Sequence, residues 1–156
     1  MVKEQIRVPL IAAGGIANGR GMLAAMILGA DGVQIGSRFV ASQESSAHQA
    51  FKQEVVKAKE GDTLLTLKEL APVRLLKNKF FDQVMELYKT NPSKEQLTEL
   101  LGRARAKRGM FEGDLQDGEL EIGQVAGLIH QIKPAAEIVS EIIEEFNALN
   151  ALRVVI

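Results

Sequence analysis

The first part of the chain contains two short apolar runs that flank a helical pattern. Residues 8–13 (VPLIAA) and 33–35 (VQI) are the apolar runs, and residues 20–28 (RGMLAAMIL) form the helical stretch. Apolar runs without polar alternation are typical of strands buried on both faces, as in a parallel sheet. The order strand–helix–strand predicts one βαβ unit whose two strands are parallel neighbours.

The rest of the chain predicts helices, because its apolar residues recur at spacings of three and four. The rows are Phe51, Val55 and Val56; then Leu76, Phe80, Val84 and Tyr88; then Leu97, Leu100, Leu101 and Ala104; and, after Pro134, Ile138, Val139, Ile142, Ile143, Phe146 and Leu149. We expect Ile138, Ile142, Ile143 and Phe146 of the last row to face other parts of the protein. The chain is thus predicted to be a single partial domain, with a βαβ unit over 1–45 and a helical region over 46–156.

Two strands are too few for a stable open sheet or a closed barrel. Either further strands lie hidden in the region that reads as helical, or the chain is part of something larger, and we favour the second. Apolar surface is then expected to remain exposed around Leu10, Ile11, Val33 and Ile35. Such surface predicts self-association or completion by a missing part of the fold.

Each predicted strand of the βαβ unit ends in a glycine beside another small residue. The pairs are Gly14–Gly15 and Gly36–Ser37. Glycine tolerates positive φ and lets backbone N–H groups approach an anion closely, and a following helix N-terminus adds partial positive charge. Two such turns on adjacent parallel strands predict a phosphate site, to which Ser37 adds a hydroxyl and Arg38 a charge. The alternative is that these glycines only make tight turns.

Composition narrows the function classes. The net charge of −1 gives no overall electrostatic case for nucleic acid. The absence of cysteine excludes disulfides, thiolate metal sites and a cysteine nucleophile. No stretch approaches the ~20 apolar residues of a membrane span, and the start MVKEQIRVPL lacks the apolar run of a signal peptide. We expect a cytoplasmic protein that uses no metal.

The segment AAGGIANGRGMLAAMILGADGVQIGSRF resembles the C-terminal phosphate-binding segment of the nitronate monooxygenases, also called 2-nitropropane dioxygenases. It is similar, too, to the FMN-dependent enoyl-acyl-carrier-protein reductase II enzymes. The likeness resumes at GMFEGDLQDGELEIGQVAGLI, which is specific to this family. The resemblance implies an α/β fold: the C-terminal part of a flavin-binding (β/α)8 TIM barrel, with two parallel strands and a mainly helical remainder.

The resemblance also implies a cofactor, FMN, and the residues that bind it. The FMN phosphate would be held by Gly14, Gly15, Gly36 and Ser37. Gln34 ends the second strand and is expected to face the cofactor, while Gly123 and Gln124 match the family segment that approaches the flavin.

Family members are considerably longer, and their N-terminal half carries a catalytic histidine in a glycine-rich loop. That histidine is expected to lie outside this chain. His48 is predicted to be an exposed residue at a helix start, and His130 to lie near a helix end. Glu119 and Glu121 are predicted to lie in a polar loop.

Three functions follow from the resemblance. The first is an FMN-dependent nitronate monooxygenase, which oxidises small-molecule nitronates with O2. The second is an enoyl-acyl-carrier-protein reductase that uses NAD(P)H; an acidic carrier protein would suit two basic groups, made of Arg74, Lys77 and Lys79 and of Arg103, Arg105, Lys107 and Arg108. Two solvated helix faces explain those groups better. The third is a non-catalytic fragment or a module that a partner completes.

Overall fold

The computed structural model describes residues 2–152, which divide into two compact units. Unit 1 comprises Met1–Ser45 and Lys133–Ile156, and unit 2, Ser46–Ile132, is inserted between its two segments. Among the described residues, no helix is both long and apolar enough to cross a membrane.

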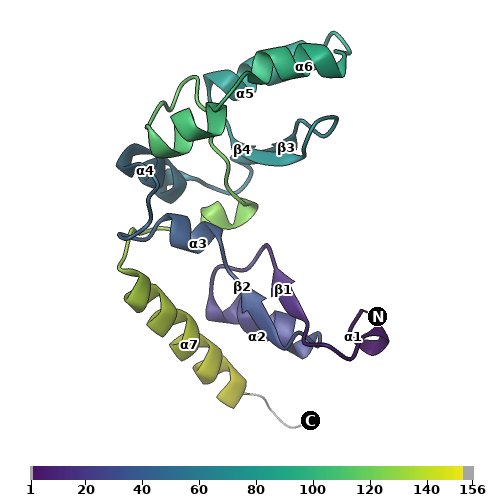
Figure 1. The fold of residues 1–156 in the computed structure, drawn as a ribbon. Helices are drawn as coiled ribbons and strands as arrows, with labels where there is room; N and C mark the ends of the chain where they lie inside the picture. The colour runs from purple at the N-terminus through teal and green to yellow at the C-terminus, as the bar shows by residue number, and fades with distance from the viewer. Residues whose placement is uncertain (1, 153–156) are drawn as a thin grey trace. The chain divides into compact units, whose positions relative to one another are not determined.

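Unit 1 contains the predicted βαβ arrangement (Figure 1). Its elements are α1 (Val2–Gln5), β1 (Ile11–Ala13), α2 (Gly19–Ile27), β2 (Gly32–Gln34), α3 (Ser37–Val40) and α7 (Ala135–Ala151). Strands β1 and β2 pair in parallel, with Ile11 opposite Gly32 and Ala13 opposite Gln34. The predicted parallel pair with its crossover helix is confirmed.

Strand β1 is shorter than the run 8–13 from which it was predicted. Pro9 has no N–H to donate to a neighbouring strand. The N–H of Leu10 donates instead to the Asp31 carboxylate at 2.7 Å. Strand pairing therefore begins only at Ile11.

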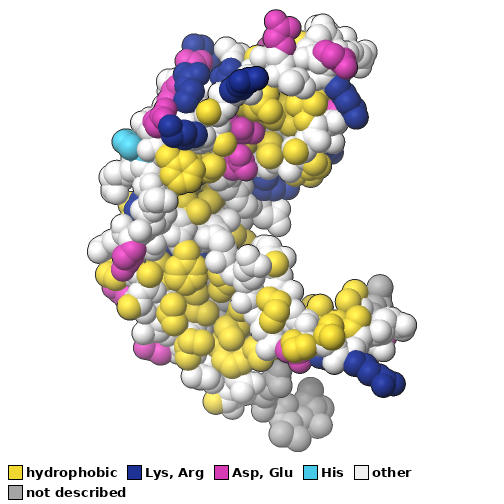
Figure 2. All heavy atoms as spheres, viewed as in Figure 1, with side chains coloured by type: hydrophobic (Ala, Val, Ile, Leu, Met, Phe, Trp, Pro, Cys, Tyr) yellow, Lys and Arg dark blue, Asp and Glu magenta, His cyan; other side chains and the backbone are white. Residues whose placement is uncertain are grey.

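Helix α7 packs against α2 and α3 within unit 1. Ile138 and Ile142 are buried in this contact and Phe146 is half-buried, as predicted for the apolar row. The prediction is wrong for Ile143, which is 41% exposed, because the row is wider than the face that α2 covers. Exposed Val139 lies on the same uncovered side, and hydrophobic side chains are visible on the surface of this unit (Figure 2).

Two glutamates cap the long helices of unit 1 from a distance along the chain. The carboxylate of Glu44, in the loop after α3, accepts the N–H of Ala135 at the start of α7 at 2.8 Å. The carboxylate of Glu145, in α7, accepts the N–H of Gly19 at the start of α2 at 2.8 Å. Each carboxylate satisfies an orphan N–H and faces the positive end of a helix dipole. These contacts tie the two chain segments of unit 1 together.

The outer edge of the parallel strand pair has no strand partner among the described residues. Ile11 on β1 is 54% exposed, whereas Leu10, Val33 and Ile35 are half-buried. The prediction of exposed apolar surface is confirmed at Ile11. Self-association remains a prediction.

Unit 2 combines helices with an antiparallel hairpin. Its elements are α4 (Gln49–Lys57), β3 (Thr63–Thr66), β4 (Val73–Leu76), α5 (Lys79–Tyr88), α6 (Lys94–Leu101), a π-helix η1 (Lys107–Phe111) and a 3-10 helix η2 (Gln124–Leu128). Strands β3 and β4 pair from Thr63–Leu76 to Thr66–Val73. This hairpin lies in the region predicted to be helical, so strands were indeed hidden there.

The row from Leu76 to Tyr88 crosses an element boundary. Leu76 ends β4, and α5 begins only after Asn78, whose side-chain oxygen accepts the N–H of Phe81 at 2.9 Å. Leu76 nevertheless contributes to the buried interior of unit 2, whose main cluster contains Leu67, Leu75, Phe80, Phe81, Val84 and Leu97. Similarly, Ala104 lies beyond the end of α6.

Replacing Gly19 with alanine tests the α2–α7 contact. A β-carbon at Gly19 would lie 2.4 Å from the carbonyl oxygen of Ile142 and 2.4 Å from the amide nitrogen of Phe146. Both are backbone atoms, so we expect a loss of about 1–3 kcal/mol in the free energy of unfolding. The control is Gly21→Ala in the same helix, where the nearest atom is 3.4 Å away.

We expect Gly21→Ala to be neutral or to stabilise by up to about 1 kcal/mol, through helix propensity. Urea denaturation of both variants measures the difference. Equal unfolding free energies for the two variants would show that α2 and α7 do not approach each other this closely.

Candidate functional site

The two glycine turns of unit 1 leave the sheet at the same edge. Ala13 and Gln34 are the last paired residues of β1 and β2 and lie opposite each other in the register. Gly14 and Gly15 follow Ala13 directly, and Gly36 follows β2 after one residue. Because the strands are parallel, both turns begin at the carboxyl end of the sheet, where ligands commonly bind in α/β folds.

The backbone of the turns is open on the side where a β-carbon would stand. Gly14 and Gly15 have φ of +90° and +73°, a region that favours glycine. A β-carbon built at either of them, or at Gly36, meets no atom within 4 Å. All three glycines are exposed. This space is of the kind that an anion approaching backbone N–H groups requires.

The N-terminus of α2, in contrast, is already occupied by side chains. The Glu145 carboxylate accepts the N–H of Gly19 at 2.8 Å and of Arg20 at 3.3 Å. Asn18 accepts the N–H of Gly21 at 2.9 Å. The expectation that this helix start offers unpaired N–H groups to an anion is therefore wrong. An anion at the first turn would depend on Gly14 and Gly15.

The second turn leads into the short helix α3. Gly36 is its N-cap, with φ of −104°, and no side chain caps it there. Ser37 is its first residue and is half-buried, while Gln34 at the end of β2 is exposed. These residues lie at the edge of the sheet from which both turns start.

Arg38 does not present an exposed charge to this edge. It is buried, and burial lowers the pKa of its guanidinium while the carboxylates of Glu141 and Glu137 on α7 raise it. Its charge therefore faces α7. Lys133 pairs with the same two glutamates, at 2.8 Å from Glu137, and these pairs raise the pKa of Lys133.

Gly123 and Gln124 belong to unit 2. Gly123 is the N-cap of η2, and Gln124 is the first residue of that helix. The exposed side chain of Gln124 lines a cavity of about 650 Å³. Their approach to a flavin stays a prediction.

Neither histidine has the setting of a catalytic base. His48 is exposed and is the N-cap of α4, with its Nδ1 accepting the N–H of Ala50 at 3.1 Å. His130 is exposed and follows η2. His48 thus lies at a helix start, as predicted.

A buried carboxyl, Glu119, was missed in the sequence. It is only 5% exposed, and burial, followed by the nearby charge of Glu121, raises its pKa to about 7 against the opposing effect of Arg105. Glu119 lies outside the named helices and strands, as predicted, but it is not exposed; the segment after it touches β4 through the N–H of Leu76, which donates to Leu120 at 3.0 Å, and through a bridge between Leu75 and Glu121. The alternation Glu-Leu-Glu-Ile was the available signal for such a segment.

Most residues of the two basic groups are engaged within unit 2. Arg105 donates to the carbonyls of Leu100, Leu101 and Asp117 and lies 4.5 Å from the centre of the Phe80 ring. The ion pairs are Lys79 with Asp117 at 3.1 Å, Lys107 with Glu112 at 3.0 Å and Arg108 with Asp114 at 2.5 Å. These contacts favour the interpretation as helix faces and local pairs.

The nitronate monooxygenase family model matches residues 1–145. A probable nitronate monooxygenase of Staphylococcus saprophyticus is 40% identical over 110 residues, which cover 68% of this chain and 31% of the relative. FabK from Thermotoga maritima is 44% identical with a TM-score of 0.88, and the match covers 97% of this chain and 49% of the FabK chain. A nitroalkane oxidase from Streptomyces ansochromogenes is 30% identical with a TM-score of 0.75, and the match covers 97% of this chain and 43% of the oxidase.

This chain thus spans less than half the length of each of these three proteins. The predicted fold class, a part of a flavin-binding (β/α)8 barrel, is confirmed by the structural matches.

Protonation of Glu119 should make stability depend on pH. Its pKa is about 7 in the folded protein against 4.5 ordinarily, so between these values the folded state holds a proton that the unfolded state releases. The free energy of unfolding should therefore fall as pH rises from about 4.5 to about 7. In Glu119→Gln this contribution should vanish, which urea denaturation at pH 5 and pH 8 measures.

The control is Glu99→Gln, which neutralises an exposed glutamate of the same unit. It should leave the difference between the two pH values unchanged. A parent-like pH dependence in Glu119→Gln would contradict the raised pKa.

Proposed function

The chain belongs to the nitronate monooxygenase family, and from this premise we propose that it supplies the FMN-phosphate-binding end of a nitronate monooxygenase. The observation that carries this proposal is the pair of open glycine turns at one edge of the β1–β2 sheet. When bound, FMN would supply the redox chemistry that oxidises a nitronate with O2. The substrate is a small molecule.

The fit of the turns to a phosphate supports this cofactor. The phosphate would accept hydrogen bonds from backbone N–H groups of Gly14, Gly15, Gly36 and Ser37, and from the Ser37 hydroxyl. Bonds to a charged acceptor are stronger than neutral ones. The capping of α2 by Glu145 restricts the anion to the turns, since a second anion near that carboxylate would be repelled.

Three further residues are proposed to contact the flavin part of FMN. Gln34 is exposed at the end of β2, beside both turns, and its amide can donate or accept a hydrogen bond. Gly123 and Gln124 are included because they match the family segment near the flavin. In this proposal the catalytic histidine lies in the portion of the relatives that this chain does not match.

A second candidate is an FMN-dependent enoyl-acyl-carrier-protein reductase II. It is favoured by the 44% identity to Thermotoga FabK, which exceeds the 30% identity to the nitroalkane oxidase. The paired state of the basic residues gives little support for an acyl carrier protein docking on them. Oxidation of a nitronate with O2, against reduction of crotonyl thioester with NAD(P)H, separates the two enzymes.

Completion of the sheet is part of the proposal. The exposed Ile11 and the outer strand edges need a neighbouring layer, which another copy or the unmatched portion of the barrel would provide. We infer that this chain alone binds FMN weakly, because the flavin ring would lack most of its pocket. A cytoplasmic location agrees with this function.

The phosphate site is tested by Gly36→Val in protein reconstituted with the missing barrel portion. Gly36 has negative φ, so valine obstructs the open space without the backbone strain that it would impose at Gly15. We expect FMN affinity to fall by about tenfold or more, while riboflavin, which lacks the phosphate, binds as to the parent. Ser37→Ala removes one hydroxyl and should cost on the order of 1 kcal/mol.

Flavin fluorescence measures both affinities, and circular dichroism checks the fold. If Gly36→Val binds FMN as tightly as the parent, or if its affinity for riboflavin falls as much as its affinity for FMN, the phosphate assignment is wrong. Tight stoichiometric FMN on the 156-residue chain alone would show that it contains the ring pocket as well.

A further inference from the structure

Unit 2 contains a cavity of about 650 Å³ that the proposed phosphate site does not use. Its lining comes from the turn before β3, from the two hairpin strands and from η2. The residues that matter here are Glu60, Thr63, Arg74, Gln124, Val125 and Leu128. The cavity therefore combines a cation, an amide and apolar side chains.

Arg74 is the cation of this cavity, and it is held in place without a counter-charge. Its Nη1 donates to the carbonyl oxygen of Thr63 at 3.0 Å and to the Thr63 hydroxyl at 3.3 Å. Thr63 is buried, and Arg74 is half-buried. Among residues 2–152, no ion pair engages Arg74 and no hydrogen bond is made by its Nε or Nη2.

The remaining lining suits a ligand with a charged head and an apolar body. Gln124 is exposed and carries amide donors. Leu128 is exposed beside it, and Val125 is buried on the same helix. The one acid, Glu60, is exposed to water and makes no ion pair with Arg74 within the described part of the chain.

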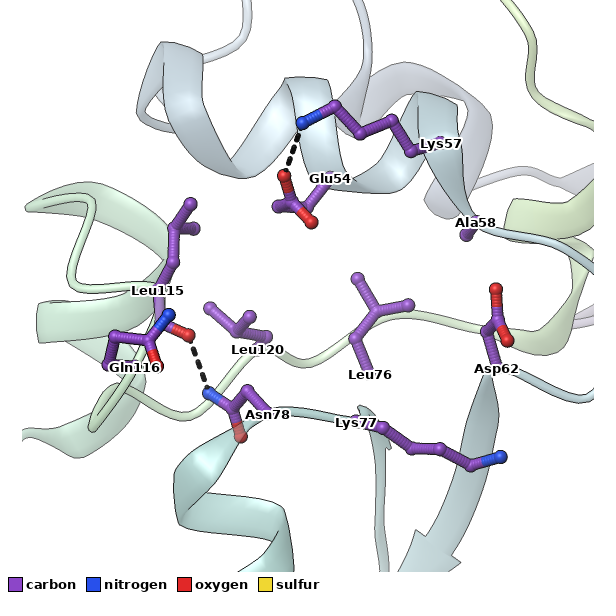
Figure 3. A pocket seen from close by; sticks show the side chains of 10 residues that line it. All are labelled: Glu54, Lys57, Ala58, Asp62, Leu76, Lys77, Asn78, Leu115, Gln116 and Leu120. Carbon is purple, nitrogen blue, oxygen red and sulfur yellow. Dashed lines mark hydrogen bonds and ion pairs between the residues drawn. The ribbon is translucent and has the colours of Figure 1, made fainter.

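A second cavity, of about 450 Å³, differs because several of the polar side chains that line it bind to one another or to the backbone (Figure 3). There Lys57 pairs with Glu54 at 2.7 Å, above a floor that includes Leu76. Asn78 donates to the carbonyl of Leu115 at 3.0 Å, and Asp62 accepts the N–H of Lys59 at 2.7 Å. That cavity contains both members of an ion pair, whereas the Arg74 cavity contains a fixed guanidinium with unused donors.

We propose that the Arg74 cavity binds a small amphipathic anion, an organic carboxylate or phosphate with a short apolar body. Arg74 binds the anionic group, which matches the planar fork of its guanidinium. Gln124 donates a second hydrogen bond, and Val125 and Leu128 contact the apolar body. Thr63 is a positioning residue that holds Arg74. All of these residues belong to unit 2, so the inference does not rest on the proposed FMN phosphate site, although Gln124 is shared with the residues proposed to contact the flavin.

The ligand class is tested on the unmodified chain by three six-carbon probes: hexanoate, hexyl phosphate and neutral hexanol. Amide chemical shifts of η2 and of β4 are followed by NMR during each titration. We expect at least one anion to shift Gln124, Val125 and Arg74 and to bind about tenfold more tightly than hexanol. The anion that binds distinguishes a carboxylate from a phosphate ligand. Hexanol binding as tightly as both anions would overturn the proposal without any variant.

Substitutions then test whether the anion binds to the guanidinium of Arg74. Arg74→Gln removes the guanidinium and should weaken binding of the preferred anion by about tenfold. Arg103→Gln is the matched control, because it removes one positive charge from an exposed arginine of the same unit. Thr63→Val removes the hydroxyl that accepts from Arg74 at 3.3 Å but keeps the carbonyl that accepts at 3.0 Å, so it should weaken anion binding less than Arg74→Gln does and leave hexanol binding unchanged. Equal effects of Arg74→Gln and Arg103→Gln, with both folded, would contradict the assignment.

Discussion

The parallel pairing of β1 with β2 is the constraint on which the candidate site depends. It sets Ala13 opposite Gln34, so that the turn after β1 and the turn after β2 both begin at the same edge of the sheet. Gly14 and Gly15 in the first turn have positive φ. A β-carbon at either of them, or at Gly36 in the second turn, would meet no atom within 4 Å. A shift of the register would move the two turns apart, and the proposed anion could then contact only one of them.

Helix α7 completes this arrangement from the other end of the chain. Its Glu145 caps α2, its backbone lies against Gly19, and its Glu137 and Glu141 face the buried Arg38. The acidic residues of α7 thus interact with the positive groups next to the turns, namely the N-terminus of α2 and the guanidinium of Arg38. The backbone of the turns themselves is left open, and this is where the proposed anion would bind.

The sequence allowed the βαβ unit to be predicted because its strands are continuous apolar runs and its breaks are glycines. It did not reveal the β3–β4 hairpin, since Leu76 continues the helical spacing of Phe80 and Val84 across the boundary at Asn78. It also did not reveal that Glu119 is buried, since a glutamate in a polar segment is expected to be exposed. The Glu145 cap could not be foreseen, because it joins residues 126 positions apart.

One titration tests the convergence of the two turns most directly. Inorganic phosphate is added to the isotope-labelled protein, and the amide shifts of Gly14, Gly15, Gly36 and Ser37 are followed together by NMR. All four amide signals should shift with a single dissociation constant, while those of Gly19 and Gly21, whose N–H groups already donate to Glu145 and Asn18, should not shift. Shifts confined to one turn, or centred on Gly19 and Gly21, would contradict a shared anion site.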